Sequence, residues 1–329
     1  MEPWIIILIV IGSILLATFL FFILPFYIIA EHVRKKQLVR RNKDMWGRAC
    51  SAPDNKEQVL MYEIGEEWGK ENSEYKNLVE ITSYDGLHLV GEFFDFGFKK
   101  CAILHQGRTE SLLYTYYFAK PYKDAGFNIL VIDPRAHGLS DGNHSTAGIK
   151  ESYDLLKWTK YIHDTFNQEE IFYHGICIGS ATCLYAMTSK NCPSYVTGMV
   201  ADGMFKDFQS TMKTHMIAEG APLASFLSFL VMVSLLFKTG ANQFRINPKR
   251  LIKKLNKPIL MLHSKEDIFS LPKYAQELYD SCNSKKRLVW FDKGAHSHIR
   301  INNQEEYDNA IISFLKDMNL WNMLLWLWM

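Results

Sequence analysis

Two periods alternate in the hydrophobic pattern of the chain, and their alternation predicts an α/β fold. Short runs rich in Val, Ile, Leu and Phe have the length of β-strands, and stretches with apolar residues every three or four positions lie between them. The strand-like runs are residues 77–83, 87–96, 101–105, 128–133, 170–175, 197–202, 258–263 and 287–291. Strands that alternate with helices predict a mostly parallel sheet with helices on both faces.

The first two strand-like runs are separated by Asp85-Gly86, a dipeptide that is typical of a hairpin turn. Helical periodicity is clearest later in the chain, in residues 151–166 and 305–318. We therefore expect an antiparallel hairpin at the edge of the sheet, followed by alternating strands and helices.

One long segment, residues 203–257, breaks the alternation. Within it, residues 221–237 are apolar on every face. A second transmembrane helix is a weaker alternative, because the charge-free run is marginal in length. An ordinary core helix is the other alternative. We expect a helical cap over the carboxyl edge of the sheet, in a position to line an acyl-substrate pocket.

The amino terminus has a different pattern, since residues 4–30 contain no charged side chain. As a helix this run is roughly 40 Å long, and a bilayer core is about 30 Å thick. A cleaved signal peptide is the alternative, but it would have a basic start, a shorter apolar core and a small-residue cleavage site. Residues 1–30 are therefore predicted to be a transmembrane anchor.

Basic residues follow the predicted anchor, whereas only Glu2 precedes it. They are Arg34, Lys35, Lys36, Arg40, Arg41 and Lys43. Because basic flanks stay in the cytoplasm, we expect a single-pass membrane protein whose body is cytoplasmic. Residues 31–75 are predicted to be a charged, partly helical linker, either merely solvated or attracted to anionic lipid.

Length and composition limit the class of protein. The 329 residues have room for one large α/β domain, residues 76–319, with appendages. The net charge is only +2 and no basic stripe runs through the body, which argues against nucleic acid as a partner. The six cysteines form no CxxC pair and have no metal-ligand spacing, so we expect free thiols in a reducing compartment, and no metal or organic cofactor.

The last ten residues, 320–329, are apolar and rich in Trp, but they are too short to span a bilayer. Three possibilities stay open for this tail. It lies at the membrane interface, where Trp is favoured, it packs on the body, or it has no role.

The candidate nucleophile lies in HGICIGSAT, residues 174–182, where Gly175 and Gly179 frame Cys177. The segment joins a strand to a helix, and a nucleophile on such a sharp turn needs small flanking residues. The backbone N–H of Ile178 would form half of an oxyanion hole. The positive potential of the helix amino terminus would also favour a thiolate at Cys177.

The second oxyanion donor is expected in HQGRT, the loop after the strand 101–105, with Gln106 and Gly107 as candidates. A plain turn glycine is an equally good explanation of Gly107 taken alone. An acid and a base should follow the nucleophile, in that order. Asp267 and His296 each come just after a later strand, with Glu266 and His298 as substitutes.

These positions predict covalent catalysis. His296 takes the proton of Cys177 or forms an ion pair with its thiolate, and Asp267 fixes the imidazole tautomer. The sulfur attacks a carbonyl carbon, the oxyanion hole holds the oxygen, and an acyl-thioenzyme forms. Water or another acceptor then resolves it.

With these residues placed, the chain resembles the α/β-hydrolase superfamily. It is especially similar to bacterial membrane-anchored hydrolases of the S33 type, the serine aminopeptidase and monoglyceride-lipase-like group. DPRAHGLSDG, residues 133–142, looks like the D-x-R-x-H-G-x-S-x-G loop of that group. The resemblance covers roughly residues 77–318 and implies an eight-stranded sheet with a variable helical cap.

The chain departs from that group at the elbow, where Cys177 replaces the usual serine. HQGRT also replaces an HG-rich oxyanion loop, and His263-Ser264 stands where His-Gly is usual. Cysteine at this position also occurs in dienelactone hydrolases, polyhydroxyalkanoate synthases and bile-acid-CoA acyltransferases.

Three functions follow from the sequence. The first is a membrane-anchored hydrolase that cleaves an ester, thioester or related acyl bond of a small or lipid-like molecule. The alternatives are an acyltransferase on the same scaffold and a non-catalytic, hydrolase-like binding module. The sequence names neither the substrate nor the protein partners.

Overall fold

An eight-stranded sheet forms the centre of the protein in the computed structural model, which describes residues 2–40 and 46–320. Its strands are adjacent in the order β1-β2-β4-β3-β5-β6-β7-β8. They are β1 (Lys76–Thr82), β2 (His88–Phe94), β3 (Lys100–His105), β4 (Asn128–Ile132), β5 (Glu170–Ile176), β6 (Val196–Asp202), β7 (Ile259–Ser264) and β8 (Lys286–Phe291). Every strand-like run of the sequence is a strand, so the expected eight-stranded sheet is confirmed.

β1 and β2 form the antiparallel hairpin at one edge of the sheet. Their turn contains Gly86 at φ 87°, a left-handed conformation that glycine adopts without strain. β2 is also antiparallel to β4, and all the remaining neighbours are parallel. The carboxyl ends of the parallel strands therefore share one edge, where the loops after β3, β5, β7 and β8 meet.

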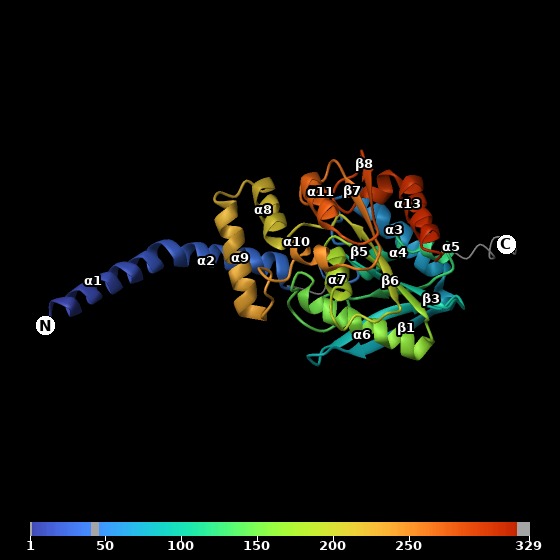
Figure 1. Ribbon diagram of the computed structural model, residues 1–329, viewed down its shortest axis with the longest axis horizontal. Coiled ribbons are helices and arrows are strands. Elements are labelled where there is room, and N and C mark those ends of the chain that lie inside the picture. The colour runs from blue at the N-terminus through green and yellow to red at the C-terminus, as the bar shows by residue number, and fades with distance from the viewer. Residues whose placement is uncertain (1, 41–45, 321–329) are drawn as a thin grey trace.

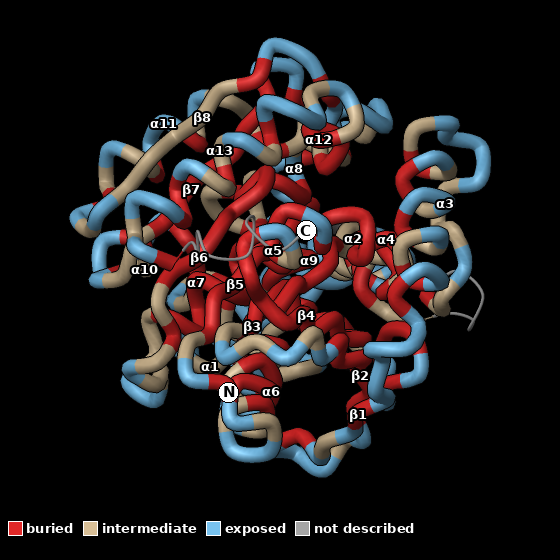
Figure 2. Tube along the Cα trace, turned by 90° about the vertical axis from the view of Figure 1, so that its right-hand side faces the viewer, coloured by how far each residue is buried: buried red, intermediate tan, exposed pale blue. Residues whose placement is uncertain are grey.

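Helices cover both faces of the sheet (Figure 1), and the strands between them are buried (Figure 2). One face packs against α3, α4, α5 and α13, and the other against α6, α7 and α11. These helices are α3 (Lys56–Glu71), α4 (Leu112–Tyr116), α5 (Lys120–Asp124), α6 (Ile149–Phe166), α7 (Ile178–Met187), α11 (Pro272–Ser281) and α13 (Gln304–Asp317). Shorter turns of helix are η2 (Ser73–Tyr75), η3 (Ile252–Lys254) and α12 (Ile299–Asn302).

The long insertion between β6 and β7 forms α8 (Phe208–Ala218), α9 (Ala224–Thr239) and α10 (Pro248–Leu251). The Asp207 carboxylate caps α8 by accepting the N–H of Ser210 at 2.8 Å. α8 and α9 contribute Phe208, Met212 and Val231 to a buried cluster that they share with residues of α2, α6 and α7. With 16 residues, α9 is short for a bilayer span, so its packing agrees with a cap better than with a second transmembrane helix.

A long amino-terminal helix projects from the body (Figure 1). It consists of α1 (Pro3–Thr18), the π-helical turn η1 (Phe19–Ile23) and α2 (Leu24–Leu38). Within the described residues, Pro3–Leu38 is the helix long and apolar enough to cross a membrane, judged by length and composition alone. No residue of α1 is buried in the protein.

Parts of residues 31–75, which the sequence predicts to be a charged, partly helical linker, pack on the body through α2 and α3. α2 packs against α9, where the Ser234 hydroxyl donates a hydrogen bond to Glu31. Arg40 then donates to the carbonyl oxygens of Ser140 at 2.9 Å and Gly138 at 2.5 Å. Glu31 and Arg40, two charged residues of the predicted linker, are therefore among the residues that attach this segment to the body.

α3 completes this attachment. The Asn55 side chain caps it, and its amino-terminal Glu57 contacts His298 at 2.9 Å. Its residue Met61 is fully buried in the core beneath α4. The Trp-rich tail lies outside the described residues, apart from Leu320, whose carbonyl accepts from Lys100.

Candidate active site

Cys177 lies on a strained turn between β5 and α7. Its φ of 53° and ψ of −112° are rare for a residue with a side chain. The turn is held by the Cys177 N–H, which donates to the carbonyl of Asp202 at 2.9 Å, and by the Ser180 hydroxyl, which contacts the carbonyl of Gly175 at 2.6 Å. This is the geometry of a nucleophile elbow, which presents the side chain at the carboxyl edge of the sheet.

The two glycines of the elbow are required by close packing. A Cβ on Gly175 would overlap the backbone of Gly179 and Ser180. A Cβ on Gly179 would overlap the carbonyl oxygen of His105, at the end of β3. Backbone atoms line both positions, so neither clash is relieved by a side-chain rotation.

His296 and Asp267 follow β8 and β7, and the structure brings them to the elbow. The Nδ1 atom of His296 lies 2.6 Å from Oδ2 of Asp267. The other carboxylate oxygen, Oδ1, accepts the N–H groups of Phe269 at 2.9 Å and Ser270 at 2.7 Å. These bonds fix the direction of the carboxylate, which in turn orients the imidazole.

Asp267 and His296 each stabilise the charged form of the other. Burial alone lowers the pKa of His296, but Asp267 and Cys177, both hydrogen-bonded to it, raise the pKa well above its ordinary value. Burial raises the pKa of Asp267, yet the neighbouring His296 more than offsets this, and the pKa is lower than usual. An imidazolium beside a carboxylate is therefore the favoured state at neutral pH, and it suits a thiolate partner.

The substitute acid and base from the sequence have other contacts. Glu266 accepts the N–H of Gly294 at 3.0 Å. His298 is bonded to Glu57 at 2.9 Å and to Gln58 at 2.8 Å, both on α3. The pair Asp267 and His296 is the one placed beside the elbow.

Of the candidate oxyanion donors, Ile178 is the first residue of α7, so its N–H has no carbonyl partner within the helix. The N–H of Gly107 differs from expectation, because it donates to the Glu110 carboxylate at 2.7 Å. The side chain of Gln106 donates to the Glu110 carbonyl. The N–H of Gly107 is therefore engaged in this conformation, and Gln106 is the other candidate from the sequence.

Glu110 is a site residue that the sequence did not single out. It is buried beside Cys177 and His296, and burial raises its pKa to about 7 although the Gly107 N–H and His296 lower it. Its only signal in the sequence is its place in the loop after β3. A carboxylate at that place is usually solvated, so burial could be learned only from the structure.

A small cavity of about 110 Å³ opens at Cys177. The loop after β3 supplies Arg108 and Glu110, α8 supplies most of the apolar wall, and His296 lies on the opposite side. Its remaining lining residues are Ile178, Phe208, Thr211, Met212, His215, Phe269 and Ser297. Ligand pockets usually measure about 300–1,000 Å³. A substrate too large for this cavity of about 110 Å³ therefore requires α8 to move.

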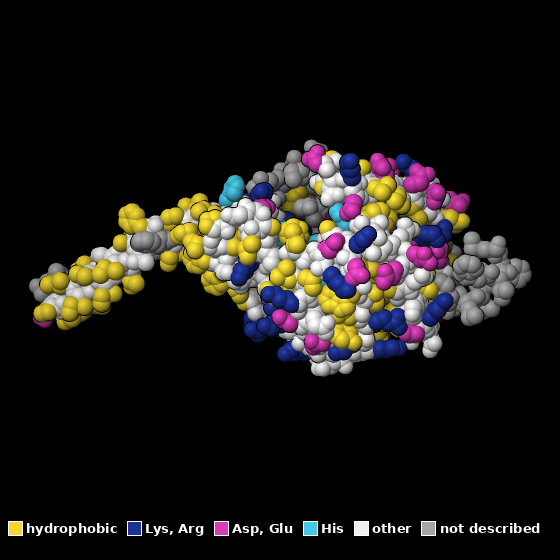
Figure 3. Space-filling view, turned by 90° about the horizontal axis from the view of Figure 1, so that it is seen from above, with side chains coloured by type: hydrophobic (Ala, Val, Ile, Leu, Met, Phe, Trp, Pro, Cys, Tyr) yellow, Lys and Arg dark blue, Asp and Glu magenta, His cyan; other side chains and the backbone are white. Residues whose placement is uncertain are grey.

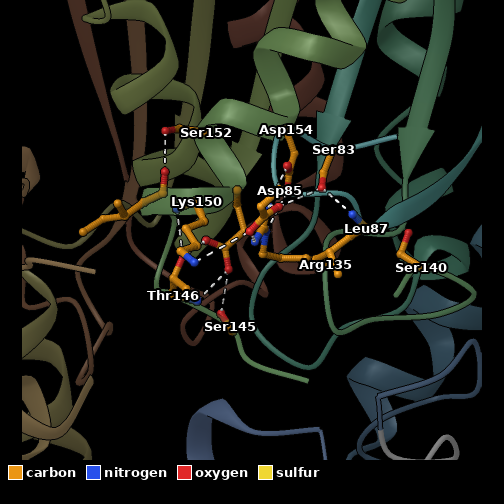
Figure 4. Close-up of polar contacts among 12 residues, drawn as sticks. Ser83, Asp85, Leu87, Arg135, Ser140, Ser145, Thr146, Lys150, Ser152 and Asp154 are labelled. Atoms are coloured by element: carbon orange, nitrogen blue, oxygen red, sulfur yellow. Dashed lines mark hydrogen bonds and ion pairs between the residues drawn. The ribbon is translucent and has the colours of Figure 1, made fainter. Parts of the chain in front are cut away.

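The DPRAHG loop supports the site without entering it. Arg135 pairs with Asp85 at 2.9 Å and with Asp154 at 2.7 Å (Figure 4). His137 accepts the N–H of Thr109 at 3.3 Å, which ties this loop to the one that carries Gly107.

A larger cavity, of about 680 Å³, is lined in part by the cap residues Met232 and Phe244 and does not include Cys177.

Comparison with known proteins agrees with this geometry. A sequence model described as the alpha/beta hydrolase fold matches residues 103–230. The solved structure of the Pyrococcus furiosus esterase Pf2001 is similar with a TM-score of 0.63 and 24% identity, over 76% of this chain and 93% of that one. The chain has the α/β-hydrolase fold.

Two curated proteins are similar in sequence. Protein YqkD of Bacillus subtilis is 27% identical over 223 residues, which cover 66% of this chain and 71% of that protein. Protein bem46 of Schizosaccharomyces pombe is 25% identical over 201 residues, which cover 60% of this chain and 61% of that protein. Neither protein's name gives a substrate.

The described residues also bear on metal binding. Within residues 2–40 and 46–320, no group of three or more His, Cys, Asp or Glu side chains is placed to hold a metal ion. The buried carboxylates of this α/β-hydrolase fold are instead bonded to Arg, Tyr, His or backbone N–H groups, for example Asp202 to Tyr307 at 2.7 Å.

Proposed function

We propose that the protein is a membrane-anchored hydrolase that cleaves an ester, thioester or related acyl bond through Cys177, His296 and Asp267. The observation that supports this most is the strained elbow that places Cys177 in one cavity with His296, whose ring is bonded to the buried Asp267. The α/β-hydrolase fold and the esterase among its structural relatives agree with the reaction class.

The mechanism starts from the Cys177 thiolate and the His296 imidazolium. The sulfur attacks the carbonyl carbon, and the N–H groups of Ile178 and Gln106 hold the oxyanion. As the tetrahedral intermediate collapses, the bond to the leaving group breaks and the imidazolium gives that group its proton. His296, now neutral, takes a proton from water, and the hydroxide attacks the thioester and releases the carboxylic acid and the thiolate.

The shape and lining of the cavity bear on the substrate. Its wall on the α8 side is largely apolar, with Phe208 and Met212, whereas Arg108 and Glu110 lie on the other side. An acyl chain fits the first side and the polar leaving group the second. The apolar amino-terminal helix would hold this site near a bilayer, which favours a lipid-like acyl substrate.

Topology and location belong to the same proposal. The basic residues that follow the span favour a cytoplasmic body. A reducing cytoplasm would also keep Cys177 as a thiol.

An acyltransferase is the second candidate, and the nucleophile favours it. A thioester intermediate at Cys177 transfers readily to an amine or thiol as well as to water. If a nucleophile other than water enters beside His296, the same residues carry out acyl transfer.

The test is to treat the full-length protein in detergent with activated acyl esters, thioesters and a fluorophosphonate, and to locate adducts by peptide mass spectrometry. We expect acylation at Cys177, lost in Cys177→Ala and strongly reduced in His296→Ala. The partly exposed Cys192 is the internal control for ordinary thiol reactivity. Labelling of Cys177 no greater than that of Cys192 would favour the non-catalytic binding module.

A further inference from the structure

Helix α9 exposes large apolar side chains on the side that faces away from the body. Its inner side, with Leu227 and Val231, is buried. The outer face of α9, as we define it, consists of Leu223, Phe226, Phe229 and Phe237, which are 59%, 41%, 43% and 78% exposed. Their spacing places these four side chains on one side of the helix. A soluble protein rarely leaves such an aromatic stripe uncovered.

This face adjoins the apolar amino-terminal helix. The ring of Phe226 packs edge-on against Phe26 of α2, with 5.6 Å between centroids. A bilayer core of about 30 Å takes roughly 20 helical residues, so a span that begins near Pro3 ends near Ile23. Phe26, and with it Phe226, then lies within one turn of the end of the span.

The orientation of α9 matches this position. In Figure 1, α9 crosses the long helix rather than continuing along it, at the end of the body from which α1 projects. Figure 3 shows the hydrophobic side chains of α1 and α2 continuing onto the adjoining end of the body. A helix placed across a span lies along the plane of the membrane.

We propose that the outer face of α9 binds the lipid bilayer surface beside the amino-terminal span, an inference that rests on the proposed anchor. Amphipathic helices in this position bury their apolar side about 5–10 Å into the boundary between headgroups and acyl chains. Lys238 follows Phe237 directly, and Arg245 adjoins Phe244, whose ring contacts Phe229. These exposed cations are placed to reach anionic headgroups at the rim.

The same contact gives the substrate a path. α8 packs on α9, and the side of α8 that carries Phe208 and Met212 lines the cavity at Cys177. Two packed helices therefore separate the bilayer from the site. A lipid-like acyl chain that enters between them reaches the cavity at Cys177 without crossing bulk water.

The test uses the full-length protein in vesicles of phosphatidylcholine and phosphatidylglycerol, with a photo-reactive benzoylphenylalanine at one position at a time. Phe237 reports on the outer face of α9, and Leu8, 59% exposed, reports on the span. Leu78, 60% exposed on β1, is the matched control away from the membrane. After illumination, lipid and protein adducts are counted by mass spectrometry, with no substrate needed.

We expect lipid adducts at Leu8 and Phe237, and several-fold fewer at Leu78. Lipid adducts at Leu8 with protein cross-links or none at Phe237 would overturn the inference and leave the anchor standing, and cross-links to a second copy would identify a dimer face. Absence of lipid adducts at Leu8 would overturn the anchor and this inference together. Neither result bears on the Cys177 chemistry, which the acylation experiment tests separately.

Discussion

At the scale of single residues, the candidate site combines one strained position with several buried charges. Cys177 holds an unfavourable φ because the surrounding backbone leaves no alternative, as glycines at 175 and 179 show. The strain places the sulfur where His296 reaches it. Asp267 raises the pKa of His296 and so favours the charged imidazolium beside Cys177.

Glu110 yields a prediction about stability and pH. Its pKa is about 7 in the folded protein against a usual 4.5, so between these values the folded state keeps a proton that the unfolded state has released. Its contribution to the free energy of unfolding therefore falls as pH rises through this window. Glu110→Gln should be more stable than the parent by roughly 1–3 kcal/mol at pH 8, with little difference at pH 4.

Denaturant unfolding at the two pH values measures this difference. Glu67→Gln, an exposed position on α3, is the matched control and should change little at either pH. A Glu110→Gln protein that gains nothing at pH 8 relative to pH 4 would show that the carboxyl is not held protonated by burial.

The residues of the site differ in how far the sequence reveals them. Cys177, Asp267 and His296 each follow a strand, and parallel strands bring such positions together, so their proximity could be foreseen. Glu110 could not, because the cavity that encloses it is lined by α8 and by the loop after β8, segments far from Glu110 in the chain.

At the scale of elements, hydrophobic period and turn residues predicted all eight strands and the main helices. The attachment of α2 and α3 was not foreseen. These segments are charged, and periodicity counts charge as exposure, yet Arg34 is buried against Glu31 and Arg40 binds carbonyl groups of the DPRAHG loop. Long basic side chains can bury their stems and attach an element through their ends.

Arg40→Ala tests this attachment. The substitution removes two charged hydrogen bonds to the carbonyl oxygens of Gly138 and Ser140. A hydrogen bond to a charged group contributes about 1.5–3 kcal/mol, and we expect the unfolding free energy to fall by about 2 kcal/mol. Lys36→Ala, an exposed cation on α2 just before Arg40, is the matched control and should cost less than about 0.5 kcal/mol. Equal effects of the two substitutions would mean that Arg40 does not dock the segment.

At the scale of the whole molecule, the amino-terminal helix joins two roles. Its first half is uncovered and apolar, whereas its second half packs on α9, so that this helix and the cap form one continuous structure. The cap and the proposed membrane contact are therefore placed relative to one another by the packing of α2 against α9. A truncation chosen from the sequence alone, at residue 30, would cut inside this structure.

Two truncations separate the roles. Removal of residues 2–23 takes away the span and keeps α2, so we expect a folded body that still binds anionic vesicles through the outer face of α9. Removal of residues 2–38 also removes the buried side chains of Ala30, Arg34 and Leu38. The cavity that they leave should lower the unfolding free energy by roughly 3 kcal/mol or more.

Thermal unfolding and sedimentation with vesicles measure both effects. Phe237→Glu in the shorter truncation is the control, and it should release the protein from vesicles without a change in melting temperature, because that side chain is 78% exposed. If the two truncations melt at the same temperature, α2 contributes nothing to the body. A shorter truncation that fails to bind vesicles would instead assign all membrane attachment to the span, and the position of the cap would then follow from its covalent connection to α1 alone.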